Sequence, residues 1–571
     1  MHDLVIRGAT VIDGTGAEGR LADVAVDDGI ITAVSNGAGV GPGRREIDAT
    51  GLLLTPGWVD IHTHYDGQAT WDPYLTPSSW HGVTTAVFGN CSVGFAPVRP
   101  GSEPYLINLM EGVEDIPETV LAEGIDFRWE SFPEYLDVLA STPRIMDIGA
   151  QVPHATLRYY VMGERGADFA EKPDAAEIQR MGELLEESLG AGALGFTTSR
   201  TVKHRAADGR LTPSYGAEEA ELTGLAQAMK RAGAGVLEVN SDFGEGDFAR
   251  LRTAAEIAGR PLSVLLVQVD KAPNLWRETL DQVGDACADG LEVTAQVGSR
   301  PIGMLIGLEA TMNPFTSHPL WQEMADLSPR ERYQRLQAEP ELRRRLVEER
   351  PDDAHVQWMT EVLQRAFELD DSVNYEPAPE ASIAAKAKAL GRDPFDLALE
   401  LMLANDGQTL LLHPFENYCA GDLEVVKEML LDPNTVCGVA DAGAHVGIIC
   451  DASSPTSLLT HWGRDRSRGD KLPLEFLVRK QTSDTARAYG LLDRGVIAAG
   501  YKADLNLIDF DALRLHRPEL VYDLPAGGRR IIQKADGYRH TFVSGVEVMR
   551  DGEATGELPG QLLRGAQAAP N

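Results

Sequence analysis

Cysteine is scarce in this 571-residue chain, which has five, at positions 91, 287, 419, 437 and 450. Their number is odd and their spacing wide, which excludes a disulfide framework and a Cys-x-x-Cys zinc knuckle and suits a reducing compartment. Long hydrophobic runs are also missing, since no apolar stretch approaches the ~18 residues of a membrane helix. The start of the chain, MHDLVIRGATVIDG, lacks the features of a signal peptide. We therefore expect a soluble, cytoplasmic protein with no membrane partner.

Basic residues are too few to make a nucleic-acid surface. Lys and Arg number 52 against 87 Asp and Glu, for a formal net charge of −35. Binding to phosphates needs clustered positive charge, so the excess of acid is interpreted as a solubility feature. A charged fraction of 24% with ordinary apolar content argues against wholesale disorder. The length predicts two or three domains, and oligomeric state is left open.

The two ends of the chain are both rich in short β-strands. Alternating apolar segments separated by Asp-Gly and Ser-Gly turns predict these strands, and no helical period accompanies them. They are expected at residues 4–12, 24–26, 30–34, 46–54, 504–509, 530–533 and 541–549. Residues 1–55 and 493–560 are therefore predicted to build one small β-sandwich from both termini, followed by a loose tail at 561–571.

The middle of the chain, residues 56–492, alternates apolar strands with amphipathic helices such as Ala175–Leu189 and Ala217–Ala232. This alternation is typical of parallel βα units. Eight strands are expected, at residues 59–62, 84–88, 145–152, 193–197, 236–240, 262–268, 291–297 and 436–441. Eight units favour a (β/α)8 TIM-like barrel, an α/β fold, over a doubly wound open sheet.

One more apolar segment, Thr409–Phe415, is a ninth candidate for eight strand positions. It follows a polar, helix-rich stretch, Trp321–Leu403, which we interpret as part of an insertion at about 300–405. The segment contains His413, whose role the sequence does not define.

A His-x-His pair stands at the end of the first barrel strand, in LLLTPGWVDIHTH. Alternate residues of a strand project to the same side, so His62 and His64 can bind one ion together. Imidazole suits zinc and its neighbours among the transition metals. The pair alone is a weak signal, and its position after a Pro-Gly turn and a strand strengthens it.

Two further metal-capable side chains follow barrel strands. Cys91 ends TTAVFGNC after the second strand, and Asp441 lies in VCGVADAGAH after the eighth. Strands eight, one and two are neighbours in a closed barrel, so these residues and the histidine pair are expected to converge at its C-terminal face. Each alone has an ordinary structural interpretation, as a buried thiol or a turn carboxylate.

A glycine pattern near the start, from Gly14 to Gly19, matches G-x-G-x-x-G. The residues after it predict a strand rather than a helix, so no helix N-terminus is available for a pyrophosphate. We interpret this segment as a hairpin loop. Single histidines at 154, 445 and 461 follow predicted strands and are more often packed or solvated than functional.

These motifs together resemble the metal-dependent amidohydrolase superfamily, and most closely its N-acyl-D-amino-acid deacylase (D-aminoacylase) subgroup. The resemblance covers nearly the whole chain and rests on GVTTAVFGNCSVGFAP, VPHATLR, GALGFTTS and DAGAH. A cysteine ligand after strand two is a habit of that subgroup, so Cys91 is its specific part. The resemblance implies zinc and hydrolysis of an amide, with Asp441 as general base and acid.

The sequence departs from the family at strands five and six, where the resemblance implies two metal-binding histidines. The aligned segments GVLEVNSD and LSVLLVQVDK hold Asn240 (or Glu238) and Gln268 instead. We therefore predict one Zn²⁺, held by His62, His64, Cys91 and Asp441, and a second metal position without its histidines. The residues expected to bind the small-molecule amide substrate are Asn240, Gln268, Lys271, His154, Arg158 and His445.

The predicted reaction is hydrolysis of the linear amide of an N-acyl amino acid, with the D configuration favoured by the resemblance. Two alternatives stay open. One is a sibling hydrolase of a cyclic amide or another C–N bond, because the missing histidines can mark altered chemistry. The other is a non-catalytic binding protein on a degenerate barrel. The acyl group, the side chain and the handedness of the substrate are not defined by the sequence.

Overall fold

Strands from the two ends of the chain pair in one sheet. The computed structural model describes residues 1–35 and 39–570. A nine-stranded sheet runs in the order β25-β24-β23-β18-β5-β1-β2-β3, with β4 also paired to β1. Its strands are β1 (His2–Val11), β2 (Arg20–Asp27), β3 (Ile30–Ser35), β4 (Gly43–Asp48), β5 (Leu53–Pro56), β18 (Leu505–Ile508), β23 (Tyr538–Val543), β24 (Val546–Arg550) and β25 (Glu553–Ala554).

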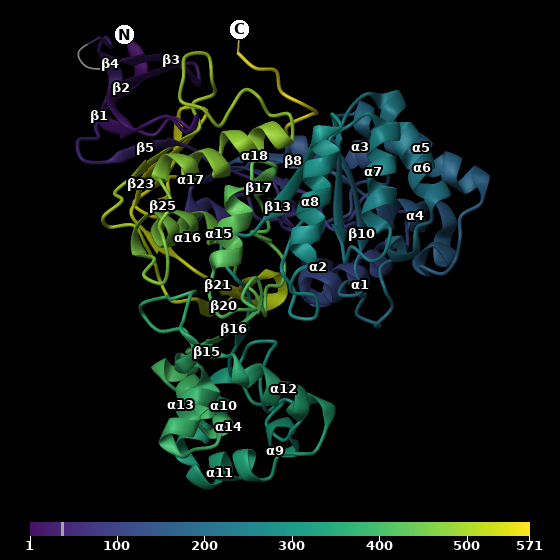
Figure 1. Cartoon of the computed structure of the whole chain (residues 1–571), viewed down its shortest axis with the longest axis vertical. Helices are drawn as coiled ribbons and strands as arrows, with labels where there is room; N and C mark the ends of the chain where they lie inside the picture. The colour runs from purple at the N-terminus through teal and green to yellow at the C-terminus, as the bar shows by residue number, and fades with distance from the viewer. Residues whose placement is uncertain (36–38, 571) are drawn as a thin grey trace.

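The join between the termini is the antiparallel pair β5–β18, in which Leu505 lies opposite Pro56. Figure 1 shows the purple N-terminal strands beside yellow C-terminal ones. Leu54, Leu507 and Phe542 pack in one buried cluster with the apolar side chains of β1 and β2. The predicted terminal sandwich is thus evident in part, since both ends contribute as expected but pair as one continuous sheet. The glycine-rich segment joins β1 to β2 in an antiparallel pair, as predicted for a hairpin.

One strand expected in the terminal sheet lies elsewhere. The segment 530–533 belongs to β21 (Gly528–Ile532), which pairs with β20 (Glu519–Leu524) in a separate two-stranded sheet. Another small sheet joins β19 (Arg514–Leu515) to β22 (Ala535–Asp536). The Ile531 N–H donates to the carbonyl of Val446, so this segment packs against the loop after the last of the parallel strands. Alternation of side chains predicts a strand but does not choose its partner.

All eight strands expected in the middle of the chain form, and all pair in parallel. Two sheets contain them, β6-β7-β8 and β17-β13-β12-β11-β10-β9. The strands are β6 (Trp58–Asp60), β7 (Val83–Phe88), β8 (Asp147–Ala150), β9 (Val152–Pro153), β10 (Gly195–Arg200), β11 (Val236–Ser241), β12 (Leu262–Leu265), β13 (Val293–Val297) and β17 (Thr435–Cys437).

Only Gln151 separates β8 from β9, so these two strands make up the third predicted segment. The Gln151 N–H donates to the Phe88 carbonyl at 2.9 Å, and the Leu194 N–H to that of Ala150 at 2.8 Å. These bonds connect the two sheets along this edge. At the other edge, an isolated parallel bridge joins Thr63 to Ala442. The order of the strands is that of the predicted barrel, and its closure stays a prediction.

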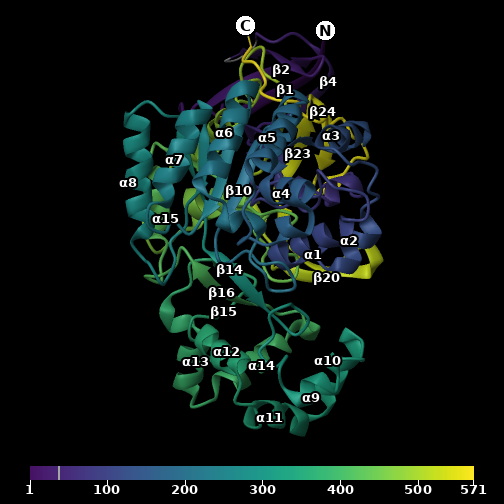
Figure 2. The same cartoon turned by 90° about the vertical axis from the view of Figure 1, so that its right-hand side faces the viewer.

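Helices cover the parallel strands (Figure 2). α5 begins with a capping box of Asp174 and Glu177 and buries Met181, Leu184 and Leu185, as its apolar period predicts. The helices of this part are α1 (Glu103–Glu114), α2 (Glu118–Gly124), α3 (Phe132–Ser141), α4 (His154–Met162), α5 (Ala175–Gly190), α6 (Glu219–Ala232), α7 (Asp247–Ala258), α8 (Leu275–Ala288), α15 (Glu424–Leu431), α16 (Ser454–Ser457), a π-helix at Leu458–Asp465, α17 (Leu474–Gln481) and α18 (Ser483–Ala488).

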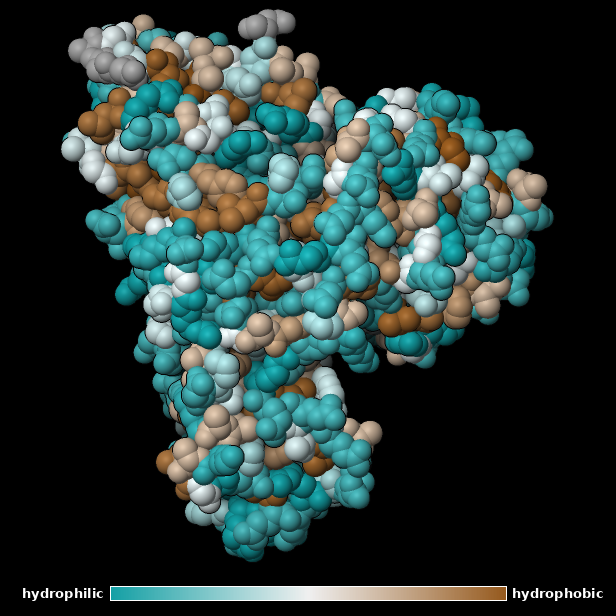
Figure 3. Space-filling view, viewed as in Figure 1, coloured by the Kyte–Doolittle hydropathy of each residue, from teal (hydrophilic) through white to brown (hydrophobic). Residues whose placement is uncertain are grey.

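The predicted insertion forms a separate helical lobe, at the bottom of Figures 1 and 2. It has its own buried core, which includes Leu336, Leu346, Met359 and Phe395. Its helices are α9 (Pro319–Gln322), α10 (Pro329–Ala338), α11 (Pro340–Glu348), α12 (Ala354–Gln364), α13 (Ile383–Leu390) and α14 (Pro394–Met402). The lobe is mostly hydrophilic on the face shown in Figure 3, as its run of Arg and Glu residues predicts.

The ninth strand candidate belongs to this insertion. It is β16 (Leu411–Glu416), which lies between β14 (Ile302–Ile306) and β15 (Phe367–Glu368) and is antiparallel to both. His413 on β16 lies opposite Met304, outside the parallel strands. The nine candidate segments therefore comprise eight parallel strands and one antiparallel strand of the insertion.

The segment expected to be a loose tail is bound to the parallel strands, and that expectation is wrong over this stretch. Ile148 donates its N–H to the carbonyl of Gln561 at 2.9 Å and accepts from the N–H of Leu563 at 2.7 Å. The Leu563 side chain is 6% exposed. Backbone pairing with β8 orders a segment whose sequence has no periodic pattern. Among the residues that the structure describes, no helix is long and apolar enough to cross a lipid bilayer.

Candidate metal centre

The histidine pair follows β6 on backbone that is hydrogen-bonded on both sides. Thr63 donates its N–H to the carbonyl of Val87 at 3.0 Å, on the β7 side. On the β17 side, the His64 N–H donates to the carbonyl of Ala442 at 2.7 Å, and the Asp441 N–H to that of His62 at 3.1 Å. The ends of strands one, two and eight are therefore held together, and the side chains of His62, His64 and Asp441 meet.

The four predicted ligands lie in one cluster. One ligand atom from each of His62, His64 and Cys91 lies within 4.8 Å of the others. The Cys91 Sγ is 3.4 Å from the His62 Nε2. The Asp441 Oδ1 lies 3.3 Å from the His62 Nε2 and 3.6 Å from the His64 Nε2. Both imidazoles and the thiol are buried, whereas 13% of the Asp441 side chain is exposed, so solvent reaches the cluster from the side of Asp441.

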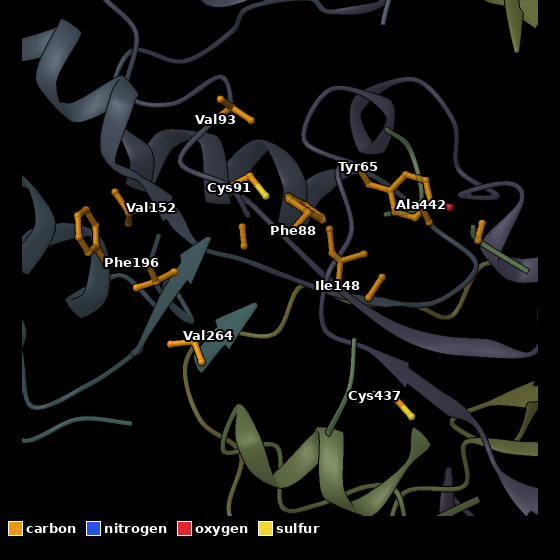
Figure 4. Packing of buried hydrophobic residues seen from close by; sticks show 14 of the residues in the cluster. Tyr65, Phe88, Cys91, Val93, Ile148, Val152, Phe196, Val264, Cys437 and Ala442 are labelled. Carbon is orange, nitrogen blue, oxygen red and sulfur yellow. The ribbon is translucent and has the colours of Figure 1, made fainter. Parts of the chain in front are cut away.

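The backbone that presents Cys91 and Asp441 is in the left-handed region. The φ angles are +54° at Cys91, +71° at Ser92 and +45° at Asp441. Non-glycine residues rarely adopt this conformation, and where they do the surrounding structure imposes it. Figure 4 shows the Cys91 sulfur in a close-packed layer that includes Phe88. The backbone strain is therefore located at Cys91 and Asp441, two of the four predicted metal ligands.

Neighbouring groups fix how the two histidines are oriented. The His62 Nδ1 lies 2.9 Å from the Gln296 Oε1, and the Gln296 Nε2 donates to the Ser263 Oγ at 2.9 Å. With its amide fixed in this way, Gln296 accepts the Nδ1 proton of His62, which leaves the His62 Nε2 lone pair free. The His64 Nδ1 faces Glu114, at 3.4 Å from its Oε1. Such partners orient the imidazole ligands of metals in many proteins.

The electrostatics of the cluster suit a cation. Burial lowers the pKa of His62 to about 4. Burial also acts to lower the pKa of His64, but the charge of Glu114 and contact with Asp441 outweigh it and raise that pKa to about 9. The Asp441 carboxyl is held well below its usual pKa, because contact with His64 and the charge of His62 outweigh its burial. Burial and nearby carboxylates raise the pKa of the Cys91 thiol, a cost that a bound cation reverses.

Three more buried carboxyl groups surround these ligands. Burial raises the pKa of Asp60 and of Asp66 to about 7 and that of Glu238 to about 8. The Glu238 Oε1 lies 3.9 Å from the His62 Nδ1. This excess of buried acid is costly without positive charge, so two imidazoles, a thiol and a carboxylate in this setting fit a zinc ion.

The structure adds a residue that the sequence analysis missed, His204, in the loop after β10. The His204 Nε2 lies 3.4 Å from the Asn240 Nδ2, and the Asn240 Nδ2 lies 3.6 Å from the Cys91 Sγ. Asn240 is thus brought to the cluster as expected, but as a neighbour of Cys91. The signal for His204 was its place four residues after the end of a parallel strand, which a search restricted to the strand ends passes over.

Two predicted substrate residues on the sixth segment lie apart from this cluster. Gln268 is buried, and its side chain donates to the carbonyl of Pro273 at 3.1 Å and accepts from the N–H of Cys419 at 3.3 Å. Lys271 is exposed just beyond β12. The strand ends at Leu265, earlier than predicted, so both residues lie on the loop that follows it.

The proposed substrate contacts of His154 and Arg158 are corrected. Both side chains are fully buried and bind Glu221: the His154 Nε2 lies 3.0 Å from its Oε1, and the Arg158 Nη1 lies 2.6 Å from its Oε2. Both side chains are paired with Glu221 inside the protein core, because a buried guanidinium needs a partner of opposite charge. His445 fits its prediction better, since it is 23% exposed and its Nε2 lies 3.5 Å from the Glu114 Oε2.

Comparisons with known proteins match this chain over most of its length. A model of the amidohydrolase family matches residues 45–549. An N-acyl-D-aspartate deacylase of Alcaligenes xylosoxydans xylosoxydans is 29% identical, with 100% of this chain and 96% of that protein covered. A D-aminoacylase of the same organism is 27% identical, with 98% and 97% covered.

Solved structures resemble the chain over its whole length. A D-aminoacylase has a TM-score of 0.65 at 24% identity, with 99% of this chain and 100% of that chain covered, a likeness of fold. An N-acyl-D-glutamate deacylase from Bordetella bronchiseptica, in complex with zinc and a phosphonate mimic of the tetrahedral intermediate, has a TM-score of 0.63 at 26% identity, with 99% of both chains covered.

Proposed function

This chain belongs to the amidohydrolase family, and from that premise we propose that it is a zinc-dependent hydrolase of N-acyl amino acids. The observation that carries the proposal is the cluster of His62, His64, Cys91 and Asp441. Relatives that match over the whole chain are named for the removal of acyl groups from D-amino acids. We therefore propose N-acyl-D-amino acids as the substrate class, and closure of the eight parallel strands into a barrel around the cluster.

One zinc ion per chain is the proposed stoichiometry. His62, His64 and Cys91 would hold it, and three protein ligands leave an open position, as catalytic zinc sites require. When bound, zinc supplies a water of lowered pKa and polarises the carbonyl of the amide.

Asp441 moves the proton in this mechanism. Its carboxyl stays ionised, because His64 and His62 hold its pKa low, and it is the partly exposed member of the cluster. It would accept a proton from the attacking water at one carboxylate oxygen and return that proton to the nitrogen of the leaving amine. Its backbone bond to His62 keeps the carboxylate beside the ligands throughout.

Lys203 is proposed to bind the carboxylate of the substrate in place of Lys271. It lies in the loop after β10 beside His204, and it pairs with the buried Glu416 of β16. Burial lowers the pKa of His204, and the charges of His445, His64 and Lys203 add to this effect. Burial raises the pKa of Glu416, the charge of Lys203 opposes this, and the charge of Asp441 adds to it, which supports a position of the Lys203–Glu416 pair near the cluster. His445 is proposed to face the substrate from the opposite loop.

An assay panel tests this function. N-acetyl and longer-chain N-acyl amino acids, in D and L forms with acidic, neutral and basic side chains, are incubated with zinc-loaded and chelator-treated protein, and amine release is measured. Zinc-dependent release from D substrates supports the proposal. A cyclic amide is assayed beside this panel, and cleavage confined to it favours the sibling reaction. A protein that retains less than ~0.3 equivalents of metal after gentle purification favours the binding protein, since such ligand sets hold zinc tightly.

A further inference from the structure

The end of β11 carries Glu238 and Asn240, and the family resemblance leads one to expect a metal-binding histidine at one of these two positions. We propose that Asn240 and His204 are positioning residues that brace the sulfur of Cys91 by hydrogen bonds, in place of binding a metal themselves. This inference rests on the proposed binding of a cation by Cys91 and assigns roles to two residues that the mechanism does not use.

The amide of Asn240 bridges the sulfur and the imidazole. Its Nδ2 lies 3.6 Å from the Cys91 Sγ, an ordinary distance for a bond to sulfur, and 3.4 Å from the His204 Nε2. An amide nitrogen carries two hydrogens, so it can donate one to each acceptor. In this orientation the Asn240 nitrogen faces the ligand, and a nitrogen with two N–H groups donates to a thiolate and does not coordinate the metal that the thiolate binds.

His204 is itself held at both ring nitrogens. Its Nδ1 lies 2.8 Å from the Ser199 Oγ. With the Nδ1 proton donated to Ser199, the Nε2 is left to accept from Asn240, and this fixes which way the amide of Asn240 points. Ser199 is fully buried on β10, so the chain of bonds is anchored in the parallel sheet.

The network then returns to the neighbour of Cys91. The Ser214 Oγ donates to the Ser199 carbonyl at 2.8 Å and accepts from the Ser199 N–H at 3.3 Å, and the Ser92 Oγ donates to the Ser214 Oγ at 2.9 Å. Bonds therefore leave the Cys91 sulfur through Asn240 and come back at Ser92. Cys91 and Ser92 are the two residues whose φ angles are positive at this turn. A closed loop of bonds of this kind keeps the strained turn in place and aims the thiolate.

The network explains how the chain functions with one cation. Within the described part of the chain, His62, His64 and Cys91 form the one group of potential metal ligands whose atoms lie within 4.8 Å of each other, and His204 is outside it. Hydrogen bonds to a coordinating sulfur withdraw electron density from it and tune the metal. A histidine at this position would add a further metal ligand. Asn240 instead changes the electronic character of the sulfur that already serves as one.

Cobalt(II) tests the brace, because a thiolate bound to Co²⁺ gives a near-ultraviolet charge-transfer band that reports on the sulfur. Asn240→Leu removes both donors at similar volume, and His204→Phe removes the acceptor that orients the amide. Both variants are expected to shift the band and to weaken Co²⁺ and Zn²⁺ binding by about 10- to 100-fold in chelator competition. His413→Phe, on β16 of the insertion, is the matched control and is expected to leave the band and the affinity unchanged.

Three outcomes decide the inference. If His204→Phe and Asn240→Leu have the same band and the same metal affinities as the unmodified protein, the brace is overturned. The proposed metal centre is not affected by that result. An unmodified protein that binds Co²⁺ without the sulfur band overturns both the brace and the assignment of Cys91 as a ligand. Weaker affinity with an unshifted band also overturns the brace, since loss of packing alone does not alter the sulfur. Thermal unfolding of each variant is measured beside these readouts to confirm that it folds.

Discussion

The Oε1 of Glu114 lies 3.4 Å from the Nδ1 of His64, and both side chains are 1% exposed. Glu114 is the last residue of α1, and its backbone carbonyl also accepts from the N–H of His445. Neither of its carboxylate oxygens has a hydrogen-bond partner within the residues that the structure describes. A buried, negatively charged group of this kind is stabilised by the positive side of a metal-bound imidazole. Glu114 is therefore a second support of the centre, beside Gln296.

The substitution Glu114→Gln tests this support. It preserves the volume of the side chain and removes the negative charge of Glu114. That charge makes the His64 imidazole a stronger electron-pair donor to a metal. We expect zinc affinity to fall by about 10- to 100-fold, measured by competition with a chromogenic chelator. Glu111→Gln, one turn earlier on the same helix and only half-buried, is the matched control. Equal affinities for the two variants would show that Glu114 is a packing residue.

The substitution Asp441→Asn tests the proton transfer. It keeps the shape of the side chain but removes the base, so we expect kcat to fall by about 10²- to 10⁴-fold with the fold intact. Zinc content is expected to change little, because His62, His64 and Cys91 are the three ligands proposed to hold the ion. Turnover at the rate of the unmodified protein would refute the proton-transfer role of Asp441. Loss of zinc together with loss of activity would show that Asp441 acts mainly as a metal ligand.

The substitution Cys91→Ala tests the thiol as a ligand. Thiolate is a strong, soft ligand for zinc, so its removal is expected to lower zinc occupancy after dialysis, read by elemental analysis. Cys437→Ala is the control, since Cys437 is equally buried on β17 but lies outside the ligand group. Zinc content in Cys91→Ala that matches the control would leave Cys91 as part of the core only.

The strands and the cluster of metal-capable side chains could be predicted because they depend on local patterns. Apolar strands and helical periods gave all eight parallel strands, and residues at the ends of neighbouring strands met as expected. Gln268 was misplaced because β12 ends three residues earlier than its apolar run, where bonds to Asn417 replace the ladder. Arg158 and His154 were misassigned because the sequence does not show that Glu221, on a distant helix, takes up their charge. Glu114 contacts His64 across 50 residues of sequence, which no local pattern reports, and His204 lies beyond the strand end to which the search was restricted.

The C-terminal segment gives a test of the fold. Leu563 is 6% exposed and packs in a cluster with Val59, Leu194 and Val236. Truncation of a buried leucine leaves a cavity, so Leu563→Ala is expected to lower the free energy of unfolding by about 2–4 kcal/mol. Leu492→Ala, at a leucine that is 40% exposed, serves as the control and is expected to cost less than about 1 kcal/mol. Chemical denaturation followed by circular dichroism measures both, and equal costs would mean that the tail does not dock in solution.

His81 makes stability depend on pH at a distance from the metal ligands. It is fully buried, with its Nδ1 2.9 Å from the Thr456 Oγ1 and its Nε2 2.8 Å from the Gln533 carbonyl. Burial, together with the charge of Arg300, lowers its pKa to about 4 from the model-peptide 6.5, despite the bond to Gln533. Because the unfolded chain takes up a proton below pH 6.5 and the folded chain does not, folding is favoured fully above that pH. The contribution of His81 to the free energy of unfolding is lost as pH falls from 6.5 toward 4, by at most ~1.4 kcal/mol per pH unit.

The substitution His81→Gln isolates this contribution. Glutamine can still donate to the Gln533 carbonyl but does not titrate, so the variant is expected to be less stable at pH 7 yet to lose less stability between pH 6.5 and 4. Urea midpoints measured across this range for the unmodified protein and the variant give the two slopes. Because other groups titrate in both proteins, their difference in slope is the quantity that His81 determines. Parallel curves would mean that His81 is protonated in the folded protein at the same pH as in the unfolded chain.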